Sequence, residues 1–438
     1  MSPHSCLSIE GPCAITGHVP IEGAKNAALP CLVAALLTTE PVTLQRVPDV
    51  IDIRNLALIL EDLGVEIAIN ETTITLQARR ITKSRPHDDL VRRLRASFLV
   101  LGPLSVRQGR AQVAYPGGCA IGRRPVDQHL KGLAALGFDV SVHDHSVDVD
   151  ASNARAGYFR FDLITVTGTE HLMMTAAALP GTTVLENCAR EPEVSQLADM
   201  LTQMGAQIEG AGHDRLVIHG NRDLGGCSLC IIPDRIEAGT YILAAVATRG
   251  HITLEPCVPE HLEALLTVLE PYQPRIQRTG AERLEVDARG RLNGEPLHLI
   301  TEPFPGFPTD LQAQLMVLLT QTPGTSRIRE TVFPERFHHA FELNRMGARV
   351  EVHPPEATVL GATALHGTDV AATDLRASAS LVIAALLASG TTTIHNIHHL
   401  HRGYAHMESK LRALGVNLRF GEPITARVAS HHARAVQG

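Results

Sequence analysis

Tryptophan is absent from the 438-residue sequence, and all aromatic residues together make up only 3% of it. Large aromatic clusters are therefore excluded as the basis of the core. Hydrophobic residues still account for 44% of the chain, so a full core has to be built from Ala, Leu, Val and Ile. The length is enough for two or three domains of ordinary size.

An excess of positive charge is also lacking, because 39 Lys and Arg stand against 46 Asp and Glu, a formal net charge of −7. Nucleic-acid-binding proteins carry a basic surface, so no nucleic-acid partner is expected. The longest apolar runs, residues 29–37 and 381–387, are far shorter than the ~20 residues that span a bilayer. The first residues lack the basic and apolar regions of a signal peptide. We therefore expect a cytoplasmic protein without a membrane partner.

The cysteine and histidine patterns do not predict a metal site. Eight cysteines in a chain of this length do not suggest a disulfide framework. Cys227 and Cys230 have the spacing of half a zinc site, but they lack a second pair and lie in a strand-like run, which favours buried thiols. In the run 395–401, His399 and His401 would share one face of a strand, but no carboxylate or cysteine lies at a suitable spacing.

One helical signature recurs six times, at intervals of roughly 65 to 77 residues: apolar residues at helical spacing, then a glycine, then a strand. Leucines spaced by three and four residues form one apolar face, and the glycine suits the left-handed position after a helix. In one degenerate copy Pro271 replaces the glycine region. The copies begin at Leu56, Leu130, Leu197, Leu262, Phe341 and Leu411.

A second type of helix, apolar on all sides, alternates with the first. Clear copies are residues 29–37, 171–179, 241–247 and 380–387, each followed by a strand rich in Thr, Val or Ile. A helix without a polar face is buried. The sequence therefore predicts an α/β protein of two similar domains, each with three units, with helices inside and sheets outside. A solenoid is the alternative, disfavoured because the units are long and their loops differ in charge.

The segment 115–127 combines proline and glycine with Cys119, Arg123 and Arg124. Proline and glycine disrupt both helix and strand, so a mobile loop is expected. A thiol next to two guanidinium groups has a lowered pKa and is more reactive than usual. The alternative is an ordinary Pro-Gly turn that happens to contain a cysteine.

Charged residues stand at the ends of the apolar helices, where a repeat does not require them. Taken singly, Asp310 and Asp374 are explained as helix N-caps, and Lys25 and Arg95 as members of surface ion pairs. Taken together they predict a strongly cationic site for a small, multiply charged anion, since arginine binds phosphate and carboxylate through two hydrogen bonds. No P-loop or dinucleotide-binding glycine motif is present. The full set is Lys25, Arg95, Arg124, Asp310, Arg336, Asp374, Arg376 and Arg402.

Several long motifs resemble those of the UDP-N-acetylglucosamine 1-carboxyvinyltransferases, a family of enolpyruvyl transferases in the EPSP synthase superfamily. The resemblance extends over nearly the whole chain. The motifs are residues 23–30, 116–127, 189–193, 233–237, 307–314, 372–380 and 402–404.

The resemblance implies a two-domain inside-out α/β barrel with three βαβαββ repeats in each domain. The implied domains are residues 24–232 and residues 1–23 with 233–438, with the active site in the cleft between them. The implied reaction transfers the enolpyruvyl group of phosphoenolpyruvate to the 3-hydroxyl of UDP-N-acetylglucosamine and releases phosphate, the first committed step of peptidoglycan synthesis. The expected partners are phosphoenolpyruvate and this or a related uridine nucleotide, with no metal and no organic cofactor.

The resemblance also implies residue roles. Cys119 is the expected acid or site of a covalent adduct, and the target of fosfomycin, while Asp310 is the expected base. The phosphate is assigned to Lys25, Arg124 and Arg402, and the carboxylate to Arg336 and Arg402. The remaining expected substrate-binding residues are Asn26, Arg95, Pro125, Val126, Asp127, Thr165, Val166, Thr167, Phe333, Asp374 and Arg376.

Two departures from the family pattern concern the acceptor. His401 stands where the family usually has Asp, and residues 163–169 differ from the usual Ser-Val-Gly-Ala-Thr loop. One alternative is a relative that acts on another nucleotide, such as UMP, in nucleoside-antibiotic biosynthesis. Shikimate 3-phosphate is disfavoured because that sister family lacks the Pro-Gly-Gly-Cys loop. A non-catalytic nucleotide-sugar-binding protein is disfavoured because the charged residues are retained.

Overall fold

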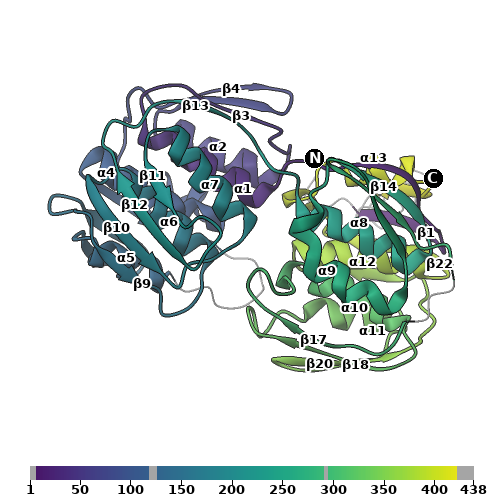
Figure 1. Cartoon of the computed structure of the whole chain (residues 1–438). Coiled ribbons are helices and arrows are strands. Elements are labelled where there is room, and N and C mark those ends of the chain that lie inside the picture. The colour runs from purple at the N-terminus through teal and green to yellow at the C-terminus, as the bar shows by residue number, and fades with distance from the viewer. Residues whose placement is uncertain (1–5, 118–125, 291–293, 422–438) are drawn as a thin grey trace, which may run out of the picture. The chain divides into compact units, whose positions relative to one another are not determined.

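The structure is a computed structural model in which residues 6–117, 126–290 and 294–421 are described. The chain divides into two compact units (Figure 1). Among the described residues, unit 1 comprises residues 6–21, 234–290 and 294–421, and unit 2 comprises residues 22–117 and 126–233.

Unit 2 contains three of the six sheets found among the described residues, with strand orders β13-β3-β5-β4, β6-β8-β7 and β11-β12-β10-β9. Its strands are β3 (Val42–Gln45), β4 (Glu66–Asn70), β5 (Thr73–Gln77), β6 (Arg110–Ala114), β7 (Asp139–Val142), β8 (Ser146–Asp150), β9 (Tyr158–Arg160), β10 (Gly181–Glu186), β11 (Gln207–Glu209), β12 (Arg215–Gly220) and β13 (Cys227–Cys230). Its helices are α1 (Lys25–Ala34), α2 (Ile51–Asp62), α3 (Asp88–Val91), α4 (Leu101–Gln108), α5 (Asp127–Ala135), α6 (Val166–Ala177) and α7 (Pro192–Gln203), with the 3-10 helices η1 (Ala35–Leu37) and η2 (Arg95–Val100).

Unit 1 contains the other three sheets, with strand orders β15-β16-β14-β2, β17-β18-β20-β19 and β21-β22-β1-β23. Its strands are β1 (Cys6–Gly11), β2 (Thr16–Pro20), β14 (His251–Glu255), β15 (Arg275–Gly280), β16 (Arg283–Asp287), β17 (His298–Thr301), β18 (Gly324–Glu330), β19 (Val350–His353), β20 (Glu356–Gly361), β21 (Asp369–Ala371), β22 (Gly390–His395) and β23 (Leu418–Gly421). Its helices are α8 (Arg235–Thr248), α9 (Glu263–Leu269), α10 (Gln312–Thr320), α11 (His338–Arg345), α12 (Leu375–Leu387) and α13 (Met407–Ala413), with the 3-10 helices η3 (Pro259–Leu262), η4 (Glu270–Tyr272), η5 (Thr309–Leu311) and η6 (Ile397–Arg402).

Each four-stranded sheet follows one connection pattern. Strand β9, for example, pairs in parallel with β10 across α6, and β11 and β12 form an antiparallel hairpin after α7. This order is a βαβαββ repeat. Three sheets include a strand from a distant segment of the chain: β13 pairs with β3, β2 pairs with β14, and β1 lies between β22 and β23. The prediction of an inside-out α/β fold built from six repeats is confirmed.

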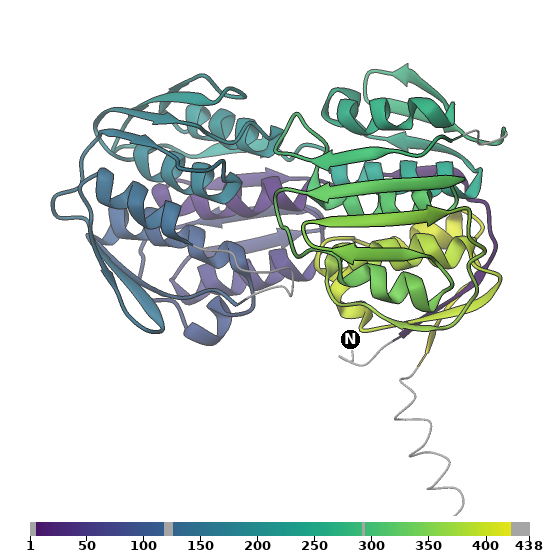
Figure 2. The same ribbon diagram turned by 90° about the horizontal axis from the view of Figure 1, so that it is seen from below.

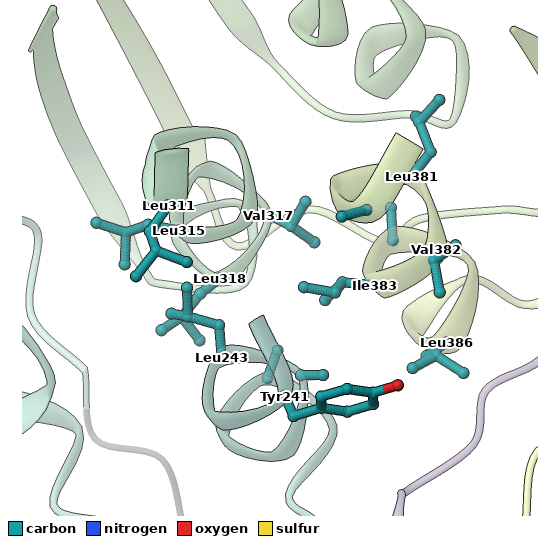
Figure 3. Close-up of a cluster of buried hydrophobic side chains, with 14 of the residues drawn as sticks. Tyr241, Leu243, Leu311, Leu315, Val317, Leu318, Leu381, Val382, Ile383 and Leu386 are labelled. Carbon is teal, nitrogen blue, oxygen red and sulfur yellow. The ribbon is translucent and has the colours of Figure 1, made fainter. Parts of the chain in front are cut away.

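The apolar helices form the interior of each unit. All nine residues of α10 are buried, as are Leu375 to Leu386 of α12. Figure 3 shows side chains of α8, η5, α10 and α12 packed against one another, among them Leu243, Leu315 and Ile383. Figure 2 shows the strands β17 to β20, in green, in front of the helices of unit 1. The prediction that helices lie inside and sheets outside follows from the lack of a polar face and is confirmed.

The glycines of the repeated signature take up the left-handed backbone that was expected of them. Each follows a helix end directly, and its φ lies between 80° and 111°. Where the fourth copy lacks the glycine, Gln273 adopts the left-handed conformation instead, with φ of 52°. The five glycines are Gly64, Gly137, Gly205, Gly347 and Gly415.

Two expectations, one about a strand and one about the burial of two thiols, are wrong. The histidine run is not a strand, because Asn396 turns the backbone left-handed with φ of 59° and η6 follows. The thiols of Cys227 and Cys230 are not both buried, because β13 is an edge strand, and the Cys230 side chain is exposed.

Within the described ranges no cluster of three metal-ligating side chains occurs, and no helix is long and apolar enough to cross a bilayer.

Helices α4 and α6 of unit 2 approach closely at Gly102. A Cβ atom on this residue would lie 2.0 Å from Thr175 Oγ1 and 2.7 Å from His171 Nε2, both on α6. Only glycine therefore permits this helix spacing.

The variant G102A is expected to lower the free energy of unfolding by about 1–3 kcal/mol, because α4 and α6 have to separate. Urea denaturation measures the change. The control G225A, where the nearest atom to a new Cβ is Met204 O at 3.8 Å, is expected to have little effect. Equal stability of G102A and wild type would contradict the close approach.

Candidate functional site

In unit 1, one carboxylate bridges two buried arginines. Asp310 Oδ1 accepts a hydrogen bond from Arg336 Nη1 and Oδ2 from Arg376 Nη2, each at 2.8 Å. The two arginines are only 5% and 3% exposed. Burial favours the neutral acid, but the charges of Arg376 and Arg336 outweigh it and hold the pKa of Asp310 well below its usual range. The bridge is therefore a carboxylate between two guanidinium groups.

The position of Arg336 is fixed from the end of β18. Glu330 is fully buried and accepts hydrogen bonds from the backbone N–H of Val332 and Phe333 and from the hydroxyl of Thr309. Thr309 Oγ1 in turn accepts from Arg336 Nη1 at 3.1 Å. The guanidinium also lies over the Phe333 ring, 5.7 Å from its centroid. Phe333 thus contacts an arginine of the candidate site, and its binding of substrate stays a prediction.

Arg376 is held by a buried polar network. Its Nη1 donates to Tyr404 Oη at 3.1 Å. Because the Thr240 hydroxyl donates to Ile236 O, its oxygen accepts the phenol proton of Tyr404. Gln314 Nε2 lies within 3.2 Å of Tyr404 Oη and 3.0 Å of the Asp310 backbone oxygen, so it links Tyr404 to the Asp310 backbone. Tyr404, Thr240 and Gln314 were not predicted as site residues.

The simple helix-cap explanation holds for one of the two aspartates. Asp374 Oδ1 accepts from the backbone N–H of Arg376 and Ala377 and is the N-cap of α12. Asp310 lies inside η5 and caps nothing through its side chain. Arg402, also predicted for the site, is the last residue of η6. Its neighbour His401 is hydrogen-bonded through Nε2 to Glu408 Oε1 at 2.5 Å.

In unit 2, the predicted lysine also meets a carboxylate. Lys25 is the first residue of α1, and its Nζ lies 3.1 Å from Asp52 Oδ2 in the first turn of α2. Both residues are buried, so this is not the surface ion pair considered from the sequence. Asn26 follows on α1 and is half-buried. Asp52 was missed by the sequence analysis because nothing in the linear sequence places it near Lys25.

The other described residues of unit 2 that were predicted to bind substrate stand at the start of helical segments. Arg95 begins η2, Val126 and Asp127 begin α5, and Thr165 is the N-cap of α6, accepting from Gly168 N. His129 on α5 links them, because its Nε2 lies 3.4 Å from Thr167 Oγ1 and the charge of Arg95 contributes to its lowered pKa. His129 was also missed, since a lone histidine on a helix carries no signal in sequence.

Three predicted residues, Cys119, Arg124 and Pro125, lie outside the described residues, and their roles stay predictions. The described residues form two sets. One, in unit 1, surrounds Asp310, and the other, in unit 2, comprises Lys25 and the helix starts near His129. Each set presents cationic or hydrogen-bond-donating groups at the ends of buried helices, an arrangement suited to anionic substrates.

The six repeated units of sheet and helices, together with these two sets of residues, define a transferase of the inside-out α/β class. The chain belongs to the EPSP synthase (3-phosphoshikimate 1-carboxyvinyltransferase) family, whose sequence profile matches residues 9–411. It is thus an enzyme of the enolpyruvyl transferase family, as the sequence motifs indicated.

Curated relatives are similar over almost their whole length. A UDP-N-acetylglucosamine 1-carboxyvinyltransferase of Koribacter versatilis is 47% identical, covering 94% of this chain and 96% of the relative. One of Anaeromyxobacter sp. is 48% identical, covering 94% and 98%. Among solved structures, the enolpyruvyl transferase NikO from Streptomyces tendae superimposes with a TM-score of 0.87 at 28% identity, covering 96% of this chain and 99% of that one.

The variant D310N is expected to lower the free energy of unfolding at pH 7 by about 3 kcal/mol, because two buried guanidinium groups lose their counter-charge. The measurement is urea denaturation from pH 7 to pH 2. The pKa of Asp310 is depressed in the folded state, so its contribution is complete above the unfolded pKa of about 4 and is lost as the pH falls through the folded value. The difference between wild type and D310N is therefore expected to shrink below pH 4.

The control is E260Q, which removes the carboxylate from an exposed pair with Arg278 in the same unit. A much smaller change is expected there, because water screens the pair. If D310N destabilised the protein no more than E260Q, the bridge would not be an important part of unit 1.

Proposed function

We propose that this protein transfers the enolpyruvyl group of phosphoenolpyruvate to the 3-hydroxyl of UDP-N-acetylglucosamine and releases phosphate. The observation that carries the proposal is the Asp310 carboxylate between Arg336 and Arg376, in a chain whose relatives of 45–48% identity are named for this reaction. Two anionic groups of phosphoenolpyruvate need cations, and the acceptor hydroxyl needs a base.

The reaction consists of an addition and an elimination. In the addition, the acceptor oxygen bonds to C2 of phosphoenolpyruvate, its proton goes to a base, and an acid gives a proton to C3. In the elimination, C3 loses a proton, the C2–C3 double bond re-forms and phosphate leaves. The family resemblance assigns the acid to Cys119 and the base to Asp310. Lys25, Arg124 and Arg402 are proposed for the phosphate, and Arg336 with Arg402 for the carboxylate.

The pairing of Asp310 bears directly on its role as a base. A carboxylate that accepts charge-assisted hydrogen bonds from two arginines has little affinity for a proton. A substrate anion that binds Arg336 takes a donor away from Asp310 and thereby raises its proton affinity. Binding of phosphoenolpyruvate is therefore proposed to prepare the base for the acceptor hydroxyl.

The acceptor assignment is supported by the curated relatives, which are named for UDP-N-acetylglucosamine and are more similar to this chain than NikO is. The UDP-N-acetylglucosamine 1-carboxyvinyltransferases are 45–48% identical to this chain, and NikO is 28% identical. A uridine nucleotide without the sugar is the second candidate, because residues 163–169 depart from the family loop. We further propose that the protein acts in the cytoplasm, in the first committed step of peptidoglycan synthesis. Binding of both substrates between the two units stays a prediction.

Phosphate release from phosphoenolpyruvate is expected with UDP-N-acetylglucosamine and not with UMP. A coupled phosphate assay measures both, and mass spectrometry of the nucleotide product checks for the added enolpyruvyl group. Release with UMP only would support the nucleoside-antibiotic alternative. Release with neither acceptor would overturn the proposed reaction.

The variant C119S is expected to lower kcat by about 10²–10⁴, because a hydroxyl is a far weaker acid than a thiol. The matched control is C230S, which changes an exposed thiol on β13 and is expected to keep wild-type activity. Fosfomycin is expected to add to wild type and C230S but not to C119S, as seen by intact-protein mass spectrometry. Full activity of C119S would contradict the proposal that Cys119 is the acid.

A further inference from the structure

Two histidines of unit 2 form a buried hydrogen-bonded pair. His129 on α5 and His171 on α6 face each other with their Nδ1 atoms 3.2 Å apart. They are 3% and 0% exposed. The Phe98 ring packs edge-on against His129, with centroids 5.4 Å apart. Water therefore has little access to either ring.

One backbone hydrogen bond determines which nitrogen carries the proton in each of the two rings. Gly102 N lies 2.8 Å from His171 Nε2, and a backbone N–H can only donate, so this nitrogen carries no proton. A neutral His171 then carries its proton on Nδ1 and donates it to His129 Nδ1. His129 in turn carries its proton on Nε2, which lies 3.4 Å from Thr167 Oγ1.

Both rings are held in the neutral form. Burial lowers the pKa of His171 to about 3. Burial, His171 and the charge of Arg95 lower the pKa of His129 well below its usual value. Protonated His129 would also place two Nδ1–H groups against each other. The direction of the hydrogen bonds is therefore fixed from Gly102 through His171 and His129 to Thr167.

This direction determines what the Thr167 hydroxyl does. Its oxygen accepts from His129, so its own proton is available to a third group. Among the described residues no other hydrogen-bond partner of this hydroxyl is recorded. Thr167 is half-buried in the first turn of α6, next to its N-cap Thr165. The hydroxyl therefore adds one oriented donor to a helix start that already favours anions.

We propose that His129 and His171 are positioning residues for the acceptor substrate: they fix the Thr167 hydroxyl as a donor to an anionic oxygen of the nucleotide. The inference rests on the proposed function and on the expectation from the family resemblance that Thr165, Val166 and Thr167 bind the acceptor. It assigns the specificity for a diphosphate-bearing acceptor partly to two residues that touch no substrate. The charge of Arg95, another expected substrate-binding residue, also acts on His129.

Calorimetric binding of UDP to the intact protein tests the proposal. H171L and T167V are each expected to weaken UDP binding about tenfold, the loss of one hydrogen bond to a charged group. The double variant H171L/T167V is expected to bind no more weakly than T167V, because His171 acts through that hydroxyl. H171N keeps a donor toward His129 and T167S keeps the hydroxyl, and both are expected to restore binding.

A purely structural role for His171 predicts another result. In that case H171L would weaken UDP binding equally in the T167V background, and the KM for phosphoenolpyruvate would rise together with that for the acceptor. Either result would overturn the proposal, as would unchanged UDP binding in folded H171L. Thermal unfolding confirms that each variant is folded.

The tautomers are checked in the wild-type protein, so the test does not depend on the folding of H171L. Imidazole ¹⁵N chemical shifts are expected to show a proton on Nδ1 of His171 and on Nε2 of His129, and the reverse pattern would overturn the proposal. UDP binding and the tautomers need no turnover. Failure of the proposed reaction would therefore appear as missing phosphate release with the binding results intact.

Discussion

The burial of the inner helices on every side is the constraint on which the rest of this structure depends. Charged side chains cannot lie along such helices without a large desolvation cost, so they are confined to the ends. The sheets outside leave these ends as the places where polar groups gather. The helical segments begin with, or are capped by, Lys25, Arg95, Thr165, Asp234 and Asp374, and Asp310 is the second residue of η5. Fold and site therefore have the same physical origin.

The buried lysine and arginine side chains of this protein are paired with carboxylates of the protein itself. Lys25 pairs with Asp52, and Lys410 pairs with Glu237 at 2.7 Å deep in unit 1. An unpaired buried charge would cost several kcal/mol, so these partners make the cationic residues compatible with a stable fold. The Asp310 carboxylate has a second proposed role, because this counter-ion of the two arginines is also the proposed base. Under the proposed function, a substrate anion would compete with the Asp310 carboxylate for Arg336 and Arg376.

The sequence predicted the repeats well because each depends on local patterns. Apolar spacing and a glycine after the helix are readable within one segment, and Gly64 and its counterparts adopt the expected backbone. Contacts between distant segments could not be predicted from the sequence. His129 and His171 are 42 residues apart, and nothing in either segment indicates that they pair. The histidine run failed as a strand because a single left-handed residue, Asn396, ended β22. Asp310 and Asp374 looked alike in sequence and differ only through their partners in space.

Strand β1 gives the chain an order of assembly. It pairs with β22 on one side and β23 on the other, and β2 pairs with β14. The first strands made by the ribosome therefore wait for partners that emerge hundreds of residues later. The described strands of the unit 2 sheets all lie between Val42 and Cys230, so they are all synthesised before those partners exist. During synthesis the inserted unit is ready to fold first, and the surrounding unit closes only after the last strand has left the ribosome.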